Sequence, residues 1–146
     1  MTTTTESKSI SMDYELPYPP TKVWRALTEP QLLARWLMDN DIRPAVGQHF
    51  TFRSQPMPWW DGIVRCEVLE IDPHKCLRYT WQSGPESSPL DTVVTWTLTP
   101  TPSGGTRLAL EHSGFTPANG AALEGARTGW KRMVGERLKE VLAKAA

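Results

Sequence analysis

The middle of the sequence alternates apolar and polar residues in two pairs of segments, and a turn signal joins each pair. In the first pair, WDGIVRCEVLEIDP leads through Asp72-Pro73-His74-Lys75 to a segment over residues 75–81. In the second pair, residues 92–99 and 106–113 flank PTPSGG. A period of two is typical of strands, and an antiparallel sheet with one covered face shows it most clearly. The sequence therefore predicts two β-hairpins in one antiparallel sheet.

The turn of the first hairpin fixes its register and decides between a disulfide and two thiols. If Asp72 pairs with Lys75, the facing pairs are Cys66 and Trp81, Val68 and Tyr79, Glu70 and Leu77, and Ile71 and Cys76. Cys66 and Cys76 then lie five residues apart along the strands, about 17 Å at the usual strand rise. A disulfide cannot span that distance. We therefore expect two reduced thiols, as in a cytosolic protein.

The second hairpin predicts an aromatic-rich inward face. Its register places inward residues opposite each other in three pairs, Val94 and His112, Trp96 and Leu110, and Leu98 and Leu108. Tyr79 and Trp81 have the same inward parity in the first hairpin. Facing apolar and aromatic pairs of this kind stabilise an antiparallel sheet. Both hairpins are therefore expected to turn aromatic side chains toward one covered side.

The N-terminal part begins with a polar tail and a strand. Residues 1–8 are rich in threonine and are expected to be disordered. Residues 9–146 are expected to form one domain, which the length favours. The next apolar residues alternate with polar ones as in a half-buried strand; they are Ile10, Met12, Tyr14 and Leu16. Pro17 then ends this strand.

Two short helices are predicted in VWRALTEPQLLARW and the residues just before it. Pro20 and Pro30 each suit the first turn of a helix, where the missing N–H costs nothing. Thr28 is the expected cap of the second helix. Trp24 and Trp36 give each helix an aromatic side chain to bury. We expect these helices to act as a lid between the first and second strands.

A long amphipathic helix is predicted from Thr116-Pro117 nearly to Ala146. Its inward stripe has helical spacing and comprises Leu123, Ala126, Arg127, Trp130, Val134, Leu138 and Val141. A long antiparallel sheet curls, and such a helix can fill its concave face. The sequence thus predicts an α+β fold, with about six to seven strands wrapped around a C-terminal helix and two short helices between strands one and two.

Composition excludes several classes of function. The 16 basic and 16 acidic residues balance, so no charged surface for nucleic acid is expected. The stretch MTTTTESK lacks the apolar core that a signal peptide would have, and no apolar run is long enough to suggest a membrane span. His49, Asp39 and Asp41 are close in sequence, but their spacing matches no metal site. We expect a soluble cytoplasmic protein with no metal or cofactor, and no nucleic-acid or membrane partner.

The order of these segments resembles the helix-grip fold of the START or Bet v 1-like superfamily (SRPBCC). The matching pieces are VWRALTEPQLLARW, GQHF, DGIVRCEVLEIDPHKCLRYTW, TVVTWTL, GGTRLALEHSGF and a final GW, from about Ser9 to Leu142. Within the superfamily, they are most similar to the bacterial group resembling the C-terminal domain of the activator of heat-shock protein 90 ATPase. The resemblance implies a cavity that binds lipids, sterols, polyketides or aromatic compounds. It also implies a link to a stress-response co-chaperone.

The aromatic residues are the candidate site. The expected ligand-binding residues are Trp36, Phe52, Trp59, Trp60, Tyr79, Trp81, Trp96, His112, Trp130 and Val134. Trp59 and Trp60, with Met57, lie in a proline-rich connection that would form the mouth of a cavity. Such cavities are mostly apolar, with few polar groups. The alternative is that these side chains fill the interior as an ordinary core.

Three polar residues have predicted inward positions. His112 could be a structural hydrogen-bonding residue, a ligand contact or a general base. Glu70 and Arg127 could anchor a polar group of the ligand, or could lie at the rim, where their charges reach water. A buried charge without a partner would be too costly. If both are buried, they should pair with each other or with His112.

Three functional hypotheses follow from these patterns. The first is a non-enzymatic or weakly catalytic binder of a small hydrophobic ligand, aromatic or polyketide- or lipid-like, for which no catalytic residue is named. The second is a chaperone-interaction domain, which needs an exposed apolar patch and a filled interior. The third is a cyclase or hydrolase that uses the same cavity, with His112 or a nearby acid as the base. A homodimer is left open, because no segment identifies an interface.

Overall fold

The protein is described by a computed structural model covering residues 8–56, 58, 61–83 and 90–144. The first elements are β1 (Lys8–Leu16), α1 (Pro20–Thr28), α2 (Pro30–Trp36), β2 (Asp39–Asn40) and β3 (His49–Arg53). The central strands are β4 (Ile63–Asp72), β5 (Cys76–Ser83), β6 (Leu90–Pro100) and β7 (Thr106–Phe115). A 3-10 turn (Pro117–Asn119) leads into α3 (Gly120–Arg132), a π-helical segment (Met133–Leu138) and α4 (Lys139–Lys144). The last three run on from one another and are called the C-terminal helix below.

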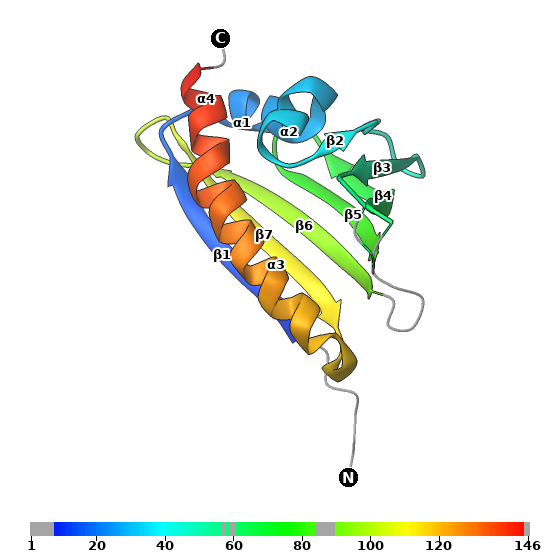
Figure 1. Ribbon diagram of the computed structural model, residues 1–146. Helices are drawn as coiled ribbons and strands as arrows, with labels where there is room; N and C mark the ends of the chain where they lie inside the picture. Colours follow the sequence, from blue (N-terminus) through cyan, green and yellow to red (C-terminus); the bar gives the residue numbers. More distant parts are fainter. Residues whose placement is uncertain (1–7, 57, 59–60, 84–89, 145–146) are drawn as a thin grey trace.

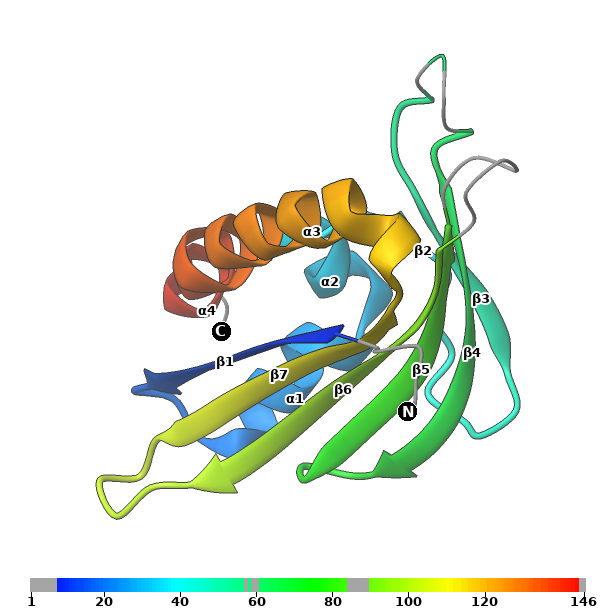
Figure 2. The ribbon, with the colours of Figure 1, turned by 90° about the horizontal axis from the view of Figure 1, so that it is seen from below.

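The strands form one curved antiparallel sheet in the order β1-β7-β6-β5-β4-β3-β2. Figures 1 and 2 show the sheet curving around the C-terminal helix, with α1 and α2 beside the C-terminal end of that helix. The predicted α+β architecture is confirmed, with the two short helices between β1 and β2. β1 begins at Lys8, the last residue of the predicted tail, and residues 1–7 lie outside the described residues. No helix in the described part of the chain is long and apolar enough to cross a membrane.

The two hairpins differ in how closely they follow the expected register. In β6–β7 the predicted pairs all form, Val94 with His112, Trp96 with Leu110 and Leu98 with Leu108. In β4–β5 the predicted pair Val68–Tyr79 also forms, but a bulge between Val68 and Glu70 shifts the pairing by one residue toward the turn. Asp72 therefore pairs with Cys76, although the predicted turn bond from Lys75 N to Asp72 O is present at 2.9 Å.

The bulge corrects the prediction that Glu70 faces inward. Glu70 lies opposite Arg78 rather than Leu77, and its Oε1 is 2.7 Å from Arg78 Nη2 with both side chains about half exposed. A bulge places two residues opposite one, so the side chains beyond it change face. Cys66 and Cys76 are both free, as predicted.

The proline-opened helices form as expected, with a different cap. Pro20 and Pro30 lie in the first turns of α1 and α2. Glu29 precedes α2, so the prediction of Thr28 as its cap is wrong; Thr28 Oγ1 instead donates to Trp24 O within α1 at 2.8 Å. Trp36 Nε1 donates to Ala26 O at 2.9 Å and ties α2 to α1. Trp24 and Trp36 are both buried, so each helix contributes its indole to the core.

The C-terminal helix buries most of its predicted stripe. Its buried apolar residues are Leu123, Trp130, Val134, Leu138, Val141 and Leu142. Arg127 departs from the prediction, because 41% of its side chain is exposed and its Nη1 bonds Glu124 Oε2 at 2.8 Å. Arg127 is therefore a rim residue whose charge reaches water, and neither it nor Glu70 is a buried anchor. Gly135 lets the helix approach β1, because a β-carbon there would lie 3.3 Å from Tyr14 Oη.

Candidate ligand-binding site

The predicted site residues that the structure describes lie between the concave face of the sheet and the helices. Tyr79 and Trp81 come from β5, Trp96 from β6, His112 from β7 and Phe52 from β3. Trp36 comes from α2, and Trp130 and Val134 come from the C-terminal helix. All eight side chains are buried. Trp59 and Trp60, with Met57, lie outside the described residues, so their place at a cavity mouth stays a prediction.

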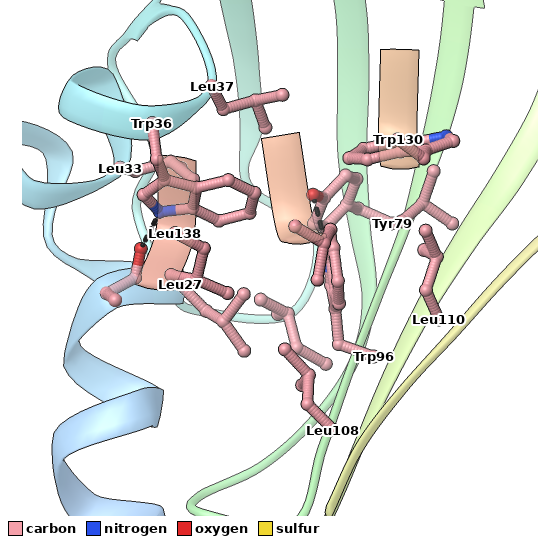
Figure 3. Close-up of a cluster of buried hydrophobic side chains, with 14 of the residues drawn as sticks. Leu27, Leu33, Trp36, Leu37, Tyr79, Trp96, Leu108, Leu110, Trp130 and Leu138 are labelled. Atoms are coloured by element: carbon pink, nitrogen blue, oxygen red, sulfur yellow. Dashed lines mark hydrogen bonds between the residues drawn. The ribbon is translucent and has the colours of Figure 1, made fainter. Parts of the chain in front are cut away.

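The aromatic rings contact one another across the interior. The ring of Trp96 lies 5.8 Å from that of Trp36 and 5.5 Å from that of Trp130, centre to centre. Trp81 lies 5.5 Å from Trp130 and 5.3 Å from Phe52. Figure 3 shows Trp96, Trp36 and Trp130 converging on one region between the sheet and the helices. In this region the indoles therefore pack as a core, with edge-on or tilted geometries that aromatic pairs favour.

A buried hydrogen-bond relay joins the helix to the sheet. Trp130 Nε1 donates to His112 Nδ1 at 3.0 Å, and His112 Nε2 lies 2.7 Å from Thr92 Oγ1. Thr92 Oγ1 donates its own proton to Trp81 O at 2.8 Å, so it accepts a proton from Nε2. This fixes His112 as the neutral tautomer that carries its proton on Nε2.

The surroundings of His112 favour its structural role. The side chain is 1% exposed, and burial lowers the pKa of His112 from 6.5 to about 4 because the charged ring would lose its hydration. Both ring nitrogens are occupied by the relay. A general base needs a free lone pair near the proton it removes. This arrangement offers none on His112, which holds Trp130 against the sheet.

Tyr79 and Trp96 form a second buried polar pair. Trp96 Nε1 donates to Tyr79 Oη at 3.0 Å. Burial raises the pKa of the Tyr79 phenol above its ordinary value, so the phenol keeps its proton. Phe50 and Phe52 contact the tyrosine ring at 5.2 and 6.1 Å, centre to centre. Tyr79 therefore presents one polar atom within an otherwise aromatic wall.

Some residues of this site were not singled out from the sequence. Thr92 completes the relay, and its inward parity with Val94 and Trp96 was a signal that could have found it. Phe115 packs on His112 with ring centres 4.6 Å apart, and Phe50 packs on Phe52 at 5.4 Å. Phe50 and Phe52 share a parity in β3, so Phe50 could also have been inferred.

The described interior holds no charged side chain and no metal site. The buried polar residues among those described are Thr28, Thr92, Thr106, His112 and Asn119. No group of three or more His, Cys, Asp or Glu side chains in the described ranges could hold a metal ion. The site is thus an aromatic surface with a few hydroxyl and ring N–H groups. Such a surface suits an uncharged, apolar molecule and offers little to a polar one.

Comparison with solved structures places the fold among known proteins. The X-ray structure of protein MLL2253 from Mesorhizobium loti has a TM-score of 0.87 and 41% identity, covering 95% of this chain and 99% of that one. Protein CV1439 from Chromobacterium violaceum has a TM-score of 0.75 and 24% identity, covering 92% of this chain and 96% of that one. DynU16, a protein in the dynemicin biosynthetic locus, has the same TM-score and identity, covering 93% of this chain and 47% of that one. The last two likenesses show the fold alone.

Sequence comparison identifies the family. No curated protein matches the sequence. A family model, described as activator of Hsp90 ATPase homolog 1-like protein, matches residues 17–143, which include every element from α1 to the last turn of the C-terminal helix. With this match over most of its length, the chain belongs to the family of activator of Hsp90 ATPase homolog 1-like proteins.

Proposed function

We propose that the protein binds a small hydrophobic molecule, of aromatic, polyketide-like or lipid-like chemistry, between the concave face of the sheet and the C-terminal helix. The observation that supports this most is the aromatic character of both walls, with Trp81 and Trp96 on the sheet facing Trp130 on the helix. Apolar area removed from water drives binding, and here that area would come from the ligand and from the part of Trp81 that remains exposed. The protein acts as a binder, and no residue is assigned a catalytic role.

The exposure of the rings favours entry at the Trp81 end of the site. Trp81 keeps 8% of its surface exposed, whereas Trp96 and Trp36 keep none. Leu90 and Leu123 also keep some exposure, at 8% and 6%. A ligand that enters here would first displace water from Trp81 and would then move this ring away from Trp130, with which it is in contact.

A structural neighbour gives modest support for small-molecule chemistry. DynU16 shares the fold and lies in a biosynthetic locus. That association is stated for DynU16 and is carried over only as part of this proposal, because the identity is 24%. The cyclase or hydrolase alternative would need a reactive group other than His112, whose nitrogens both serve the relay.

A second candidate function is protein binding, as the family name implies. Val46, in the loop before β3, and Leu69, in β4, are exposed apolar residues, at 63% and 39%. The hydrogen bond from Gly47 N to Val68 O, at 2.9 Å, places their two segments side by side. A chaperone partner could use this pair together with neighbouring surface. Two side chains make a small patch, so the ligand hypothesis is preferred.

Ligand titration monitored by tryptophan fluorescence tests the proposal. Flavonoids, polyketides, fatty acids and sterols are added separately to the wild-type protein, to Trp81→Phe and to Trp24→Phe. Trp24 is the matched control, because its ring packs against His74, outside the aromatic contacts of the proposed site. We expect saturable quenching by one class of ligand. The affinity for that class should be about fivefold to tenfold lower in Trp81→Phe and unchanged in Trp24→Phe. Absence of saturable binding by every class would contradict the proposal.

A further inference from the structure

One buried hydroxyl in the interior has a proton that no described atom accepts. Tyr79 Oη accepts the bond from Trp96 Nε1, because an indole N–H can only donate. A phenol also carries a proton of its own to donate. No described residue accepts that proton, although Tyr79 is only 1% exposed.

The other polar groups around the site are used differently. Trp36 Nε1 donates to Ala26 O, and Trp130 Nε1 donates to His112 Nδ1. His112 Nε2 donates to Thr92 Oγ1, which donates in turn to Trp81 O. Each of these donors therefore has an acceptor within the protein. Tyr79 is the exception, and an unused donor in a buried site costs free energy that an acceptor would recover.

The geometry presents this donor to the interior. Figure 3 shows Tyr79 projecting from the sheet with its oxygen toward Trp36, in the region where the helices and the sheet meet. The bond from Trp96 holds the oxygen, and the rings of Phe50 and Phe52 hold the phenol from the side. The O–H is thus held at a defined place in an aromatic surrounding, which suits a group that orients a ligand.

We propose that Tyr79 is the polar anchor of the ligand site, and that its O–H donates to a carbonyl or ether oxygen of an otherwise apolar, uncharged ligand. This inference rests on the proposed function and narrows its ligand class. A carboxylate or ammonium ligand is disfavoured, because the described interior holds no Asp, Glu, Lys or Arg to pair with it. Since Tyr79 is almost fully enclosed, the ligand oxygen reaches it by displacing a neighbouring ring, and association should be slower than simple diffusion allows.

Three probes of one shape test the anchor. Acetylnaphthalene carries a ketone oxygen, ethylnaphthalene has a similar outline without it, and naphthoate carries a charge. Each is titrated by calorimetry into the wild-type protein, Tyr79→Phe and Tyr14→Phe. Tyr14→Phe is the matched control, because it removes a hydroxyl from β1 whose bond is to Met12 Sδ. Chemical unfolding of each variant confirms that it is folded.

The wild-type protein is expected to bind the ketone about fivefold to tenfold more tightly than the hydrocarbon, and naphthoate most weakly. Tyr79→Phe should reduce the ketone preference to about one, whereas Tyr14→Phe should keep the preference of the wild-type protein. The infrared carbonyl stretch of the bound ketone should lie at lower frequency in the wild-type protein than in Tyr79→Phe, as expected for a carbonyl that accepts a hydrogen bond.

The outcomes separate the anchor from the proposed function. Binding of the hydrocarbon without a ketone preference, or a preference that survives Tyr79→Phe, would overturn the anchor and leave the binder hypothesis standing. Tighter binding of naphthoate than of the ketone would overturn the uncharged ligand class. Failure of all three probes to bind would count against the anchor and, with the fluorescence titration also negative, against the binder.

Discussion

The concave and convex faces of the sheet use alternate residues of the same strands, yet their polar contacts differ in kind. On the concave face, Trp130, His112 and Thr92 form a relay with no access to water. On the convex face, Glu70 and Arg78 form an ion pair with side chains 48% and 44% exposed. A buried donor without an acceptor destabilises the folded protein by the full cost of its desolvation. An exposed ion pair is screened by water and contributes little. Polar contacts on the two faces of the sheet therefore differ greatly in their contribution to stability.

The two faces also offer different surfaces to a ligand. A hollow of about 350 Å³ lies where β1, β7 and β6 run side by side, and Ser11, Asp13, Thr95, Thr97 and Glu111 contribute to its lining. Its hydroxyls and carboxylates favour water and polar solutes. The concave face instead presents indole rings. We therefore place the proposed hydrophobic ligand on the concave face, and the following substitutions test this difference between the two faces.

The largest expected effect is from removing a ring on the concave face. Trp96→Ala should lower the free energy of unfolding by about 3–5 kcal/mol, because it removes the contacts with Trp36 and Trp130 and leaves a cavity. The next residue on the other face, Thr97, is the control, and Thr97→Ala should change stability by about 0.5 kcal/mol or less. Urea unfolding of both variants measures this, and equal losses would contradict the assignment of faces.

The relay predicts a pH dependence of stability. His112 has a folded-state pKa of about 4 against 6.5 when unfolded, so the unfolded chain takes up a proton first as the pH falls. Stability from this group is therefore complete above pH 6.5, is lost between 6.5 and 4, and levels off below. The loss should reach roughly 3 kcal/mol, from about 1.4 kcal/mol per pKa unit. Urea unfolding across this range measures it.

The matched controls for this prediction are two histidine variants. His112→Asn should remove this part of the pH dependence, whatever its effect at neutral pH. His49→Asn changes an exposed histidine at the start of β3 and should leave the pH dependence of stability as it is in the wild-type protein. A wild-type pH profile that His112→Asn does not alter would show that the ring is not held neutral by burial.

A smaller effect separates two glycines of the C-terminal helix. Gly125→Ala should raise the free energy of unfolding by about 0.5–1 kcal/mol, because alanine is the better helix former and the new methyl group meets open space. Gly135→Ala should gain less or lose stability, because its β-carbon would lie 3.3 Å from Tyr14 Oη. Thermal unfolding compares the two, and an equal gain would show that the helix does not rest closely on β1.

The smallest effect is expected at the convex ion pair. Glu70→Gln should lower the free energy of unfolding by less than about 1 kcal/mol, since both partners are exposed and the pair is screened. The loss should shrink further in concentrated salt. A loss comparable to that of Trp96→Ala would erase the proposed difference between the faces.

The sequence predicted most of the architecture because its strands and helix have clear periods. The β6–β7 register followed from the parity of Val94, Trp96 and Leu98, and the buried stripe followed from helical spacing. The bulge at β4–β5 was missed, because the sequence VLEI does not show where one extra residue is inserted into the strand. Glu70 was misplaced as a result.

The aromatic cluster of the proposed site was predicted better than its polar contacts. Parity placed Trp81, Trp96 and His112 on one face, and the structure brings them together with Trp130. The relay could not be predicted, because it depends on the distance between the helix and β7 and on which tryptophan turns its N–H toward His112. Arg127 was misplaced because a long side chain can leave a buried stripe and reach the rim.

The most direct test of the central claim, that the concave face binds the ligand, is an NMR titration of the indole N–H signals and of the Val46 and Leu69 methyl groups. The protein is observed while the ligand class selected by fluorescence is added. We expect the Trp81 and Trp130 indole signals to shift and saturate together, whereas the signals of the exposed Val46 and Leu69 methyl groups stay in place. Shifts confined to Val46 and Leu69, with the interior indoles unmoved, would contradict this claim and favour an external binding surface.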